Sequence, residues 1–157
     1  MDQSYLNILE DSLEKKNKVL GEMLSLSEQQ GTIISDDMDL SELDPFIEKK
    51  GELIEALERL DEGFEKVYER VSEELKGNKE KYADRIKHMQ QLIREISEKS
   101  NAISVQEERN KNALQAFFGK KRNEVREGRV NSKAAMNYYK VQSNAAFVES
   151  QFMDDKK

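Results

Sequence analysis

Few side chains in this sequence of 157 residues are suited to metal or acid–base chemistry. The only histidine is His88, which follows Asp84 by one helical turn, and there is no cysteine. Two side chains on one helix are too few ligands for a structural metal site. The sequence also lacks a glycine cluster that could bind phosphate and a nucleophile motif. We therefore interpret His88 as a surface residue and expect no metal, no cofactor and no catalytic site.

An acidic loop imitates part of a calcium-binding motif. Asp37, Asp39 and Ser41 alternate along the chain, and Glu48 lies where the twelfth ligand of a calcium loop would stand. Glu42, however, occupies the position at which that loop needs glycine for its sharp turn. The cap of a following helix explains these acidic residues, so we do not expect calcium binding.

A basic stretch surrounds two glycines in the second half of the chain. Gly119 and Gly128 accompany five cationic residues: Lys120, Lys121, Arg122, Arg126 and Arg129. Phenylalanines at 117 and 118 and tyrosines at 138 and 139 flank this stretch and could stack on bases. Because no nucleic-acid recognition fold accompanies the charge, we interpret residues 119–131 as a solvated basic linker.

Composition predicts an all-helical protein. Hydrophobic residues make up 36% of the chain and charged residues 37%, with one proline and no tryptophan. Such a balance suits thin helices with wide solvated faces. No apolar run reaches the roughly 18 residues of a membrane span, and residues 1–4 do not resemble a signal peptide, so we expect a cytoplasmic protein.

The two halves of the chain carry opposite charge. Residues 1–75 contain 21 acidic and 8 basic side chains, whereas residues 76–157 contain 11 acidic and 18 basic ones. Attraction between the halves favours an antiparallel arrangement in which the chain folds back on itself.

Apolar residues at alternating steps of three and four predict three long helices. The first is expected at 4–30, ended by Gly31, and the second begins between Ser41 and Pro45, with Ser41 and Asp44 as a partial capping box. The second ends near Gly77 and the third begins near Asn78. The predicted buried residues are Leu6, Leu9, Leu13, Leu20 and Met23, then Leu43, Phe46, Leu53, Leu57, Leu60, Phe64, Val67 and Val71, then Tyr82, Ile86, Met89, Ile93, Ile96, Ile103, Leu114 and Phe117.

Polar residues and glycines interrupt these helices. Lys16 and Lys50 occupy apolar positions of the first and second helices, and Glu107 and Asn110 do so in the third. We therefore expect the C-terminal half of the third helix to be less well buried than its N-terminal half. Glycines at 51 and 63 lie inside the second helix, where we expect close approach of a neighbouring helix, with a bend as the alternative.

The end of the chain carries a weaker amphipathic stripe. Small and apolar residues recur at steps of four and three: Ala134, Tyr138, Val141, Ala145, Val148 and Phe152. This segment either packs on its own bundle or binds an apolar face of another protein. The predicted architecture is an all-α, antiparallel up-down bundle of three long helices (1–118), a basic linker (119–131) and a C-terminal amphipathic helix or tail (132–157).

Residues 46–64, FIEKKGELIEALERLDEGF, resemble the second helix of FlgN-type flagellar export chaperones. The total length, the opening helix from Leu6 to Leu26 and the tail that ends in FMDDKK are similar to that family as well. The resemblance implies a small cytoplasmic chaperone, without enzymatic activity, that binds hook-associated junction proteins before type III export and delivers them to the export gate.

In such a chaperone the bundle is a scaffold and the C-terminal segment binds the C-terminal helix of the client. By position, Tyr138 or Tyr139 would dock on the gate, and the client-facing side chains would be Val141, Phe147, Val148 and Phe152. A filament-cap protein is an alternative client. Two other functions stay open from the residues alone: a coiled-coil adaptor that self-associates along its long seam, and a nucleic-acid-binding bundle that uses residues 120–133.

Overall fold

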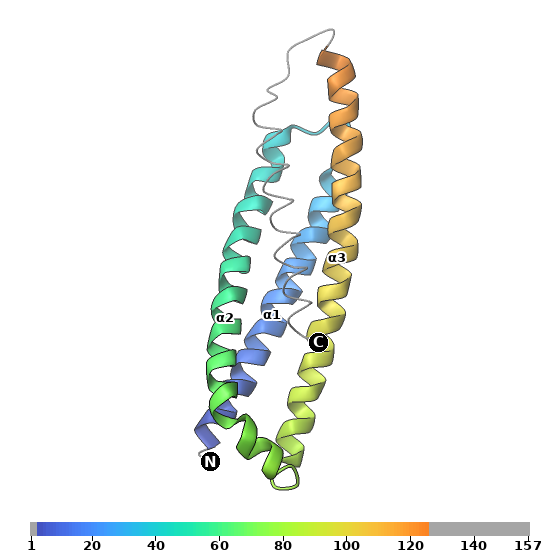
Figure 1. Cartoon of the computed structure of the whole chain (residues 1–157). Helices are drawn as coiled ribbons and strands as arrows, with labels where there is room; N and C mark the ends of the chain where they lie inside the picture. The colour runs from blue at the N-terminus through green and yellow to red at the C-terminus, as the bar shows by residue number, and fades with distance from the viewer. Residues whose placement is uncertain (1–2, 126–157) are drawn as a thin grey trace.

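The computed structural model describes residues 3–125, which form a bundle of three long helices. The elements are α1 (Gln3–Ile33), a 3-10 turn η1 (Leu40–Leu43), α2 (Asp44–Gly77) and α3 (Ala83–Val125). The helices run up, down and up, so that each is antiparallel to the helix before it (Figure 1). The predicted all-α antiparallel bundle is confirmed.

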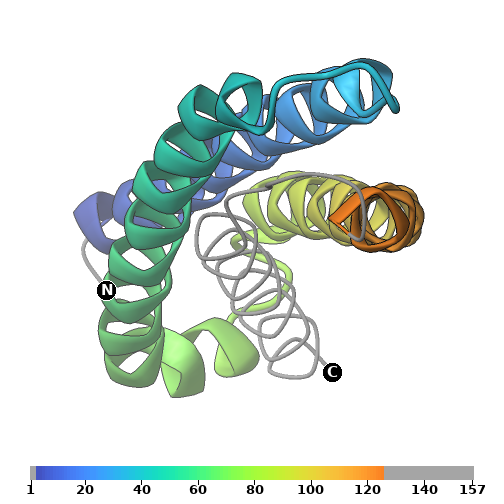
Figure 2. The same ribbon diagram turned by 90° about the horizontal axis from the view of Figure 1, so that it is seen from above.

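α1 is the central helix of the bundle. It packs along both α2 and α3, which the view down the bundle axis shows on either side of it (Figure 2). The buried residues of α1 follow one another at strict steps of three and four: Leu6, Leu9, Leu13, Lys16, Leu20, Met23, Ser27 and Gln30. This is the spacing at which a helix presents a single seam to its neighbours.

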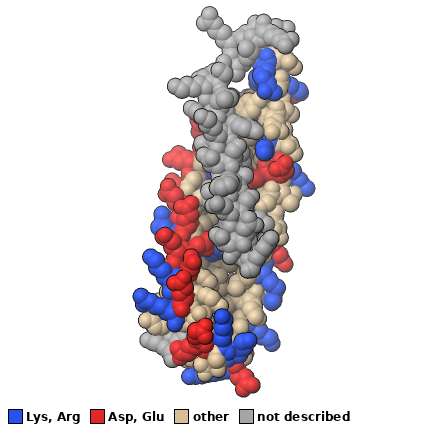
Figure 3. All heavy atoms as spheres, viewed as in Figure 1, with Lys and Arg blue, Asp and Glu red and all other residues tan. Residues whose placement is uncertain are grey.

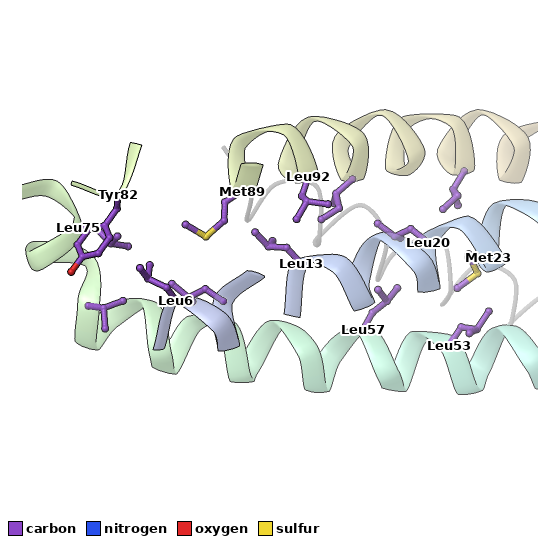
Figure 4. Close-up of a cluster of buried hydrophobic side chains, with 14 residues drawn as sticks. Leu6, Leu13, Leu20, Met23, Leu53, Leu57, Leu75, Tyr82, Met89 and Leu92 are labelled. Atoms are coloured by element: carbon purple, nitrogen blue, oxygen red, sulfur yellow. The ribbon is translucent and has the colours of Figure 1, made fainter. Parts of the chain in front are cut away.

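Two separate apolar clusters form the core. The larger, which we call the main cluster, contains fourteen buried residues, among which α1 side chains such as Leu13 and Leu20 lie between those of α2 and α3 (Figure 4). The smaller, which we call the distal cluster, contains Met38, Leu43, Leu114 and Phe117, with half-buried apolar residues around them. Burial of a large apolar side chain contributes about 1.5 to 3 kcal/mol, so most of the stabilisation comes from the main cluster.

Some of the predicted core residues are less buried than expected. Ile93 is 39% exposed, and Leu92 next to it is buried instead. The buried residue before Ile96 in α3 is thus Leu92, four positions earlier, whereas the predicted seam had Ile93, three positions earlier. In α2, Phe46, Leu60, Phe64 and Val67 are half-buried.

The close approach predicted at the two glycines in α2 is not found among the described helices. A Cβ atom added at Gly51 or at Gly63 would meet no atom of residues 3–125 within 4 Å. Close approach occurs at Gly31, where an added Cβ would lie 2.7 Å from Gln106 Nε2 and 2.8 Å from Asn110 Oδ1. Gly31 therefore does not end α1, which continues to Ile33.

The loop before α2 is capped by a different residue than expected. The Asp39 carboxylate accepts a hydrogen bond from the backbone N–H of Ser41 at 3.0 Å, which caps η1. α2 has no side-chain cap, so the predicted capping box of Ser41 and Asp44 is not formed, although Pro45 does lie in the first turn. This hydrogen bond gives the carboxylate at position 39 a role as a cap.

The connection to α3 is longer than predicted. α2 ends at Gly77 as expected, but turns occupy the next five residues and α3 begins at Ala83 rather than near Asn78. The backbone N–H of Tyr82 donates to the carbonyl of Asn78, and the buried Tyr82 ring belongs to the main cluster. α3 continues to Val125, so residues 119–125 of the predicted linker are helical.

Candidate functional site

The residues predicted to contact a client or the export gate lie outside the described part of the chain. They are Tyr138, Tyr139, Val141, Phe147, Val148 and Phe152. Residues 126–131 of the predicted linker lie outside it as well. What the structure describes is the scaffold that leads to this segment, and in particular the end of the bundle at which α3 reaches Val125.

That end of the bundle is closed by the distal cluster. Leu114 and Phe117 of α3 pack with Met38 of the α1–α2 connection and with Leu43 of η1. The Phe117 and Phe118 rings lie edge to face with centroids 5.5 Å apart. These aromatic rings, which the sequence offered as a platform for bases, are therefore used in packing at least in part.

Charged groups on the surface hold the same end together. Lys120 of α3 pairs with Asp36 of the connection, and this carboxylate raises the pKa of the Lys120 ammonium above its usual value. Lys121 contacts Glu124 at 3.0 Å and lies over the Phe117 ring, 5.5 Å from its centroid. Part of the positive charge proposed for nucleic-acid binding is thus neutralised within the bundle.

A buried polar layer separates the distal cluster from the main cluster. Its members are Ser27 and Gln30 of α1, Lys50 of α2, and Glu107 and Asn110 of α3, and each is at most 3% exposed. Lys50 forms an ion pair with Glu107 and donates a hydrogen bond to Gln30 Oε1 at 2.7 Å. Paired charges in a low-dielectric interior attract strongly, but their desolvation offsets much of that attraction.

Hydrogen bonds complete the layer on the α1–α3 side. The Ser27 hydroxyl donates to Glu107 Oε1 at 2.5 Å, and Asn110 Nδ2 donates to the Ser27 carbonyl at 2.8 Å. Gln106 donates to Asn110 Oδ1 at 2.9 Å. Glu107 and Asn110, at which the predicted apolar seam was interrupted, are buried because polar groups of the other helices satisfy them.

A second buried lysine lies near the middle of the bundle. Lys16 of α1 is 4% exposed, and its Nζ lies 2.5 Å from Oδ1 of Asp61 on α2. On the other side of α1, Asn17 accepts a hydrogen bond from Lys99 and donates one to Glu95. α1 thus contacts each neighbour through polar as well as apolar side chains.

His88 is a surface residue, as predicted. Its side chain is 49% exposed, and its Nδ1 lies 4.0 Å from Glu10, which also pairs with Arg85 at 2.6 Å. Within residues 3–125, no three histidine or acidic side chains are placed to hold a metal ion. None of the three helices in this range is long and apolar enough to cross a membrane.

The outer face of α2 carries a stripe of carboxylates. Acidic side chains gather along this helix in the space-filling view (Figure 3). Eight exposed glutamates recur there at steps of three and four: Glu48, Glu52, Glu55, Glu58, Glu62, Glu65, Glu69 and Glu73. Solvent stabilises these charges, and nothing around them forms an enclosed acid–base site.

The sequence did indicate the polar layer, but the spacing of residues along each helix did not show which polar residues pair. Lys50 and Glu107 both interrupt apolar seams, and they carry opposite charge. In an antiparallel arrangement of α2 and α3, positions 50 and 107 come to the same height, which would have predicted the pair. The two residues are 57 positions apart, so no local pattern connects them.

The three helices therefore form a scaffold in which charged groups lie either on the surface or in buried pairs. Residues 1–142 match the sequence profile of the FlgN protein family. No match was found among curated proteins or among solved structures. The matched region includes every described helix and ends within the C-terminal segment. The chain belongs to the FlgN family, and its role is that of a flagellar export chaperone.

Proposed function

We propose that this protein binds the C-terminal helices of hook-associated proteins in the cytoplasm and delivers them to the flagellar export gate. The observation that carries the proposal is the family match over residues 1–142, because FlgN proteins are export chaperones rather than enzymes. The bundle serves as the scaffold, and residues 132–157 provide the surface for the client.

The apolar surface of the described helices supports this division of roles. Four large apolar side chains are exposed within residues 3–125, and they come from all three helices: Ile8, Tyr68, Ile93 and Val105. Exposed apolar residues in such small number are normal on a folded domain. The seam of α1 is already covered by α2 and α3.

The C-terminal segment has the composition of a helix that binds an apolar partner. Val141, Phe147, Val148 and Phe152 are the proposed client-facing residues, and charged residues are few from 134 to 153. Ordering a segment when it binds reduces the net affinity, which permits release of the client at the gate.

Calorimetry with a peptide from the C-terminal helix of a hook-associated protein tests the client site. We expect deletion of residues 131–157 to abolish binding and to leave the circular dichroism of the bundle intact. Val148→Asp with Phe152→Asp should also abolish binding, because both charges would be buried unpaired in the interface. The matched control is Gln142→Asp with Ala146→Asp, two changes that lie away from all four client-facing residues on the predicted helix, and it should bind as the wild type does.

Equal affinity of the full-length and truncated proteins would refute the client site.

A second measurement separates client binding from delivery to the export gate. We propose Tyr138 and Tyr139 as the docking residues for the export gate, so changing both to alanine should weaken binding to the cytoplasmic domain of the gate. The same variant should keep its affinity for the client peptide.

A further inference from the structure

Along each of the three helices, a buried polar residue lies between the main cluster and the distal cluster. Along α1, Met23 of the main cluster is followed by Ser27 and Gln30 of the polar layer, and only then by Ile33 beside the distal cluster. Along α3, Ile103 is followed by Glu107 and Asn110, and then by Leu114. Along α2, Lys50 separates Leu43 from Leu53.

The polar layer crosses the whole core at one height. Its contacts join all three helices, because Lys50 of α2 pairs with Glu107 of α3, and both bind side chains of α1. Within residues 3–125, one buried polar atom of the layer, Gln30 Nε2, has no hydrogen-bond partner. An unsatisfied buried polar group costs about 1 to 3 kcal/mol, so this section of the core adds less stability than an apolar section of the same size.

Among residues 3–125, the end beyond the layer has few interactions of its own. Four buried residues form the distal cluster, and the Lys120–Asp36 pair that closes it is exposed, with about three fifths of each side chain accessible. Exposed ion pairs contribute at most about 1 kcal/mol. Regions with few buried apolar contacts open at lower free energy than the rest of a protein.

We propose that the polar layer divides the bundle into two cooperative units, and that the distal unit opens while the main unit stays folded. The distal unit comprises residues 31–47 and 111–125. It contains the end of α3 from which the chain continues into residues 126–157, so its opening would detach the base of that segment from α2 and η1. This inference concerns the free chain and does not depend on the identity of the client.

Native-state hydrogen exchange of the full-length protein tests the proposal. Amides of residues 31–34 and 111–118 should share one opening free energy, although these segments are far apart in sequence. They should exchange about tenfold faster or more than amides of residues 9–23 and 89–103, a difference of about 1.4 kcal/mol in opening free energy. The change should occur as a step near residues 107–110.

Two variants distinguish a cooperative unit from simple fraying of helix ends. Leu114→Ala should speed exchange in the distal unit and leave exchange of residues 9–23 unchanged. Replacing the buried polar groups by apolar ones, with Gln30→Leu, Lys50→Met and Glu107→Leu together, should join the two clusters and remove the step. The matched control is Asp11→Leu with Lys15→Met, which replaces an exposed pair and should leave the step in place.

A gradual decline of protection along α3 that the triple variant does not change would overturn the proposal. Equal protection in both units of the wild type would overturn it as well. If the triple variant does not fold, Leu114→Ala still tests the proposal. If this substitution speeds the exchange of residues 9–23 as much as that of residues 111–118, the bundle is a single unit.

Discussion

At the scale of single residues, the glycines show that sequence spacing and spatial neighbours give different information. Gly51 and Gly63 share with Gly31 a position inside a long helix, yet only Gly31 faces another helix closely. Gln106 and the buried Asn110 occupy the space in which a side chain at position 31 would lie. We therefore expect substitution by alanine to have opposite effects at Gly31 and at Gly51.

We predict that Gly51→Ala stabilises the protein by about 0.5 to 1 kcal/mol, because alanine is a better helix former and the added methyl group meets no atom of residues 3–125. Gly31→Ala gains the same helix propensity but displaces Asn110 from its hydrogen bonds. Since a buried polar group without its partner costs about 1 to 3 kcal/mol, the net effect should be destabilising. Urea unfolding of both variants measures the difference, and a stabilising Gly31→Ala would contradict the described contact.

Two leucines on α2 provide a second test at this scale. Leu57 is 6% exposed in the main cluster, whereas Leu60 is half-buried and does not belong to it. We predict that Leu57→Ala lowers the unfolding free energy by about 2 to 5 kcal/mol, as for a core cavity. Leu60→Ala should cost distinctly less. Equal thermal midpoints for the two variants would show that the bundle packs differently around α2.

At the scale of elements, most of each helix could be predicted and the exact ends could not. Periodicity identifies a helix because its apolar face repeats every 3.6 residues, and all three helices were found where that pattern was clear. The ends of helices depend on single contacts, such as the Asp39 cap or the burial of Tyr82. Such contacts leave no periodic pattern in the sequence. The Lys50–Glu107 pair was missed for a related reason, since it depends on the relative height of two helices.

The turn η1 should respond to pH through Asp39. Hydrogen bonds from the backbone N–H and the side chain of Ser41 lower the pKa of the Asp39 carboxyl below its usual 3.8. A carboxyl whose pKa is lower in the folded state stabilises the fold fully above 3.8, and this contribution is lost as the pH falls through the folded-state pKa.

We predict that Asp39→Asn removes this acid-dependent contribution, because asparagine keeps an acceptor oxygen for the cap and does not titrate. The difference in unfolding free energy between wild type and variant should be constant from pH 7 to pH 5. It should then shrink as the pH falls below 3.8. Urea unfolding at several pH values measures this, and a difference that grows in acid would contradict the assigned hydrogen bond.

At the scale of the whole molecule, the charge asymmetry explains only part of the assembly. Arg85–Glu10 and Lys120–Asp36 join a basic residue of the second half to an acidic residue of the first, as the sequence predicts. The most buried pair is reversed, with the lysine at position 50 and the glutamate at position 107. Net charge therefore favours the antiparallel fold, while the buried pair fixes the relative height of α2 and α3.

The same pair argues against the coiled-coil adaptor. If two chains associated in parallel along the seam of α2, Lys50 would face a second Lys50 instead of Glu107, which is unfavourable in a desolvated interface. We predict a monomer whose thermal midpoint does not change with protein concentration. Thermal unfolding followed by circular dichroism over a hundredfold range of concentration checks this, and a midpoint that rises with concentration would favour the adaptor.

The central place of α1 also determines when the nascent chain can fold. α1 is synthesised before α3, but its contacts with α3 join residues 75 to 83 positions apart, as in Arg85–Glu10 and Asn110–Ser27. At typical translation rates the ribosome needs roughly 5 to 15 seconds to make the chain between these partners. During that interval the apolar stripe of α1 has at most α2 to cover it. Folding is therefore completed only after α3 has left the ribosome, and until then the N-terminal helix is a candidate for general chaperones that bind exposed apolar segments.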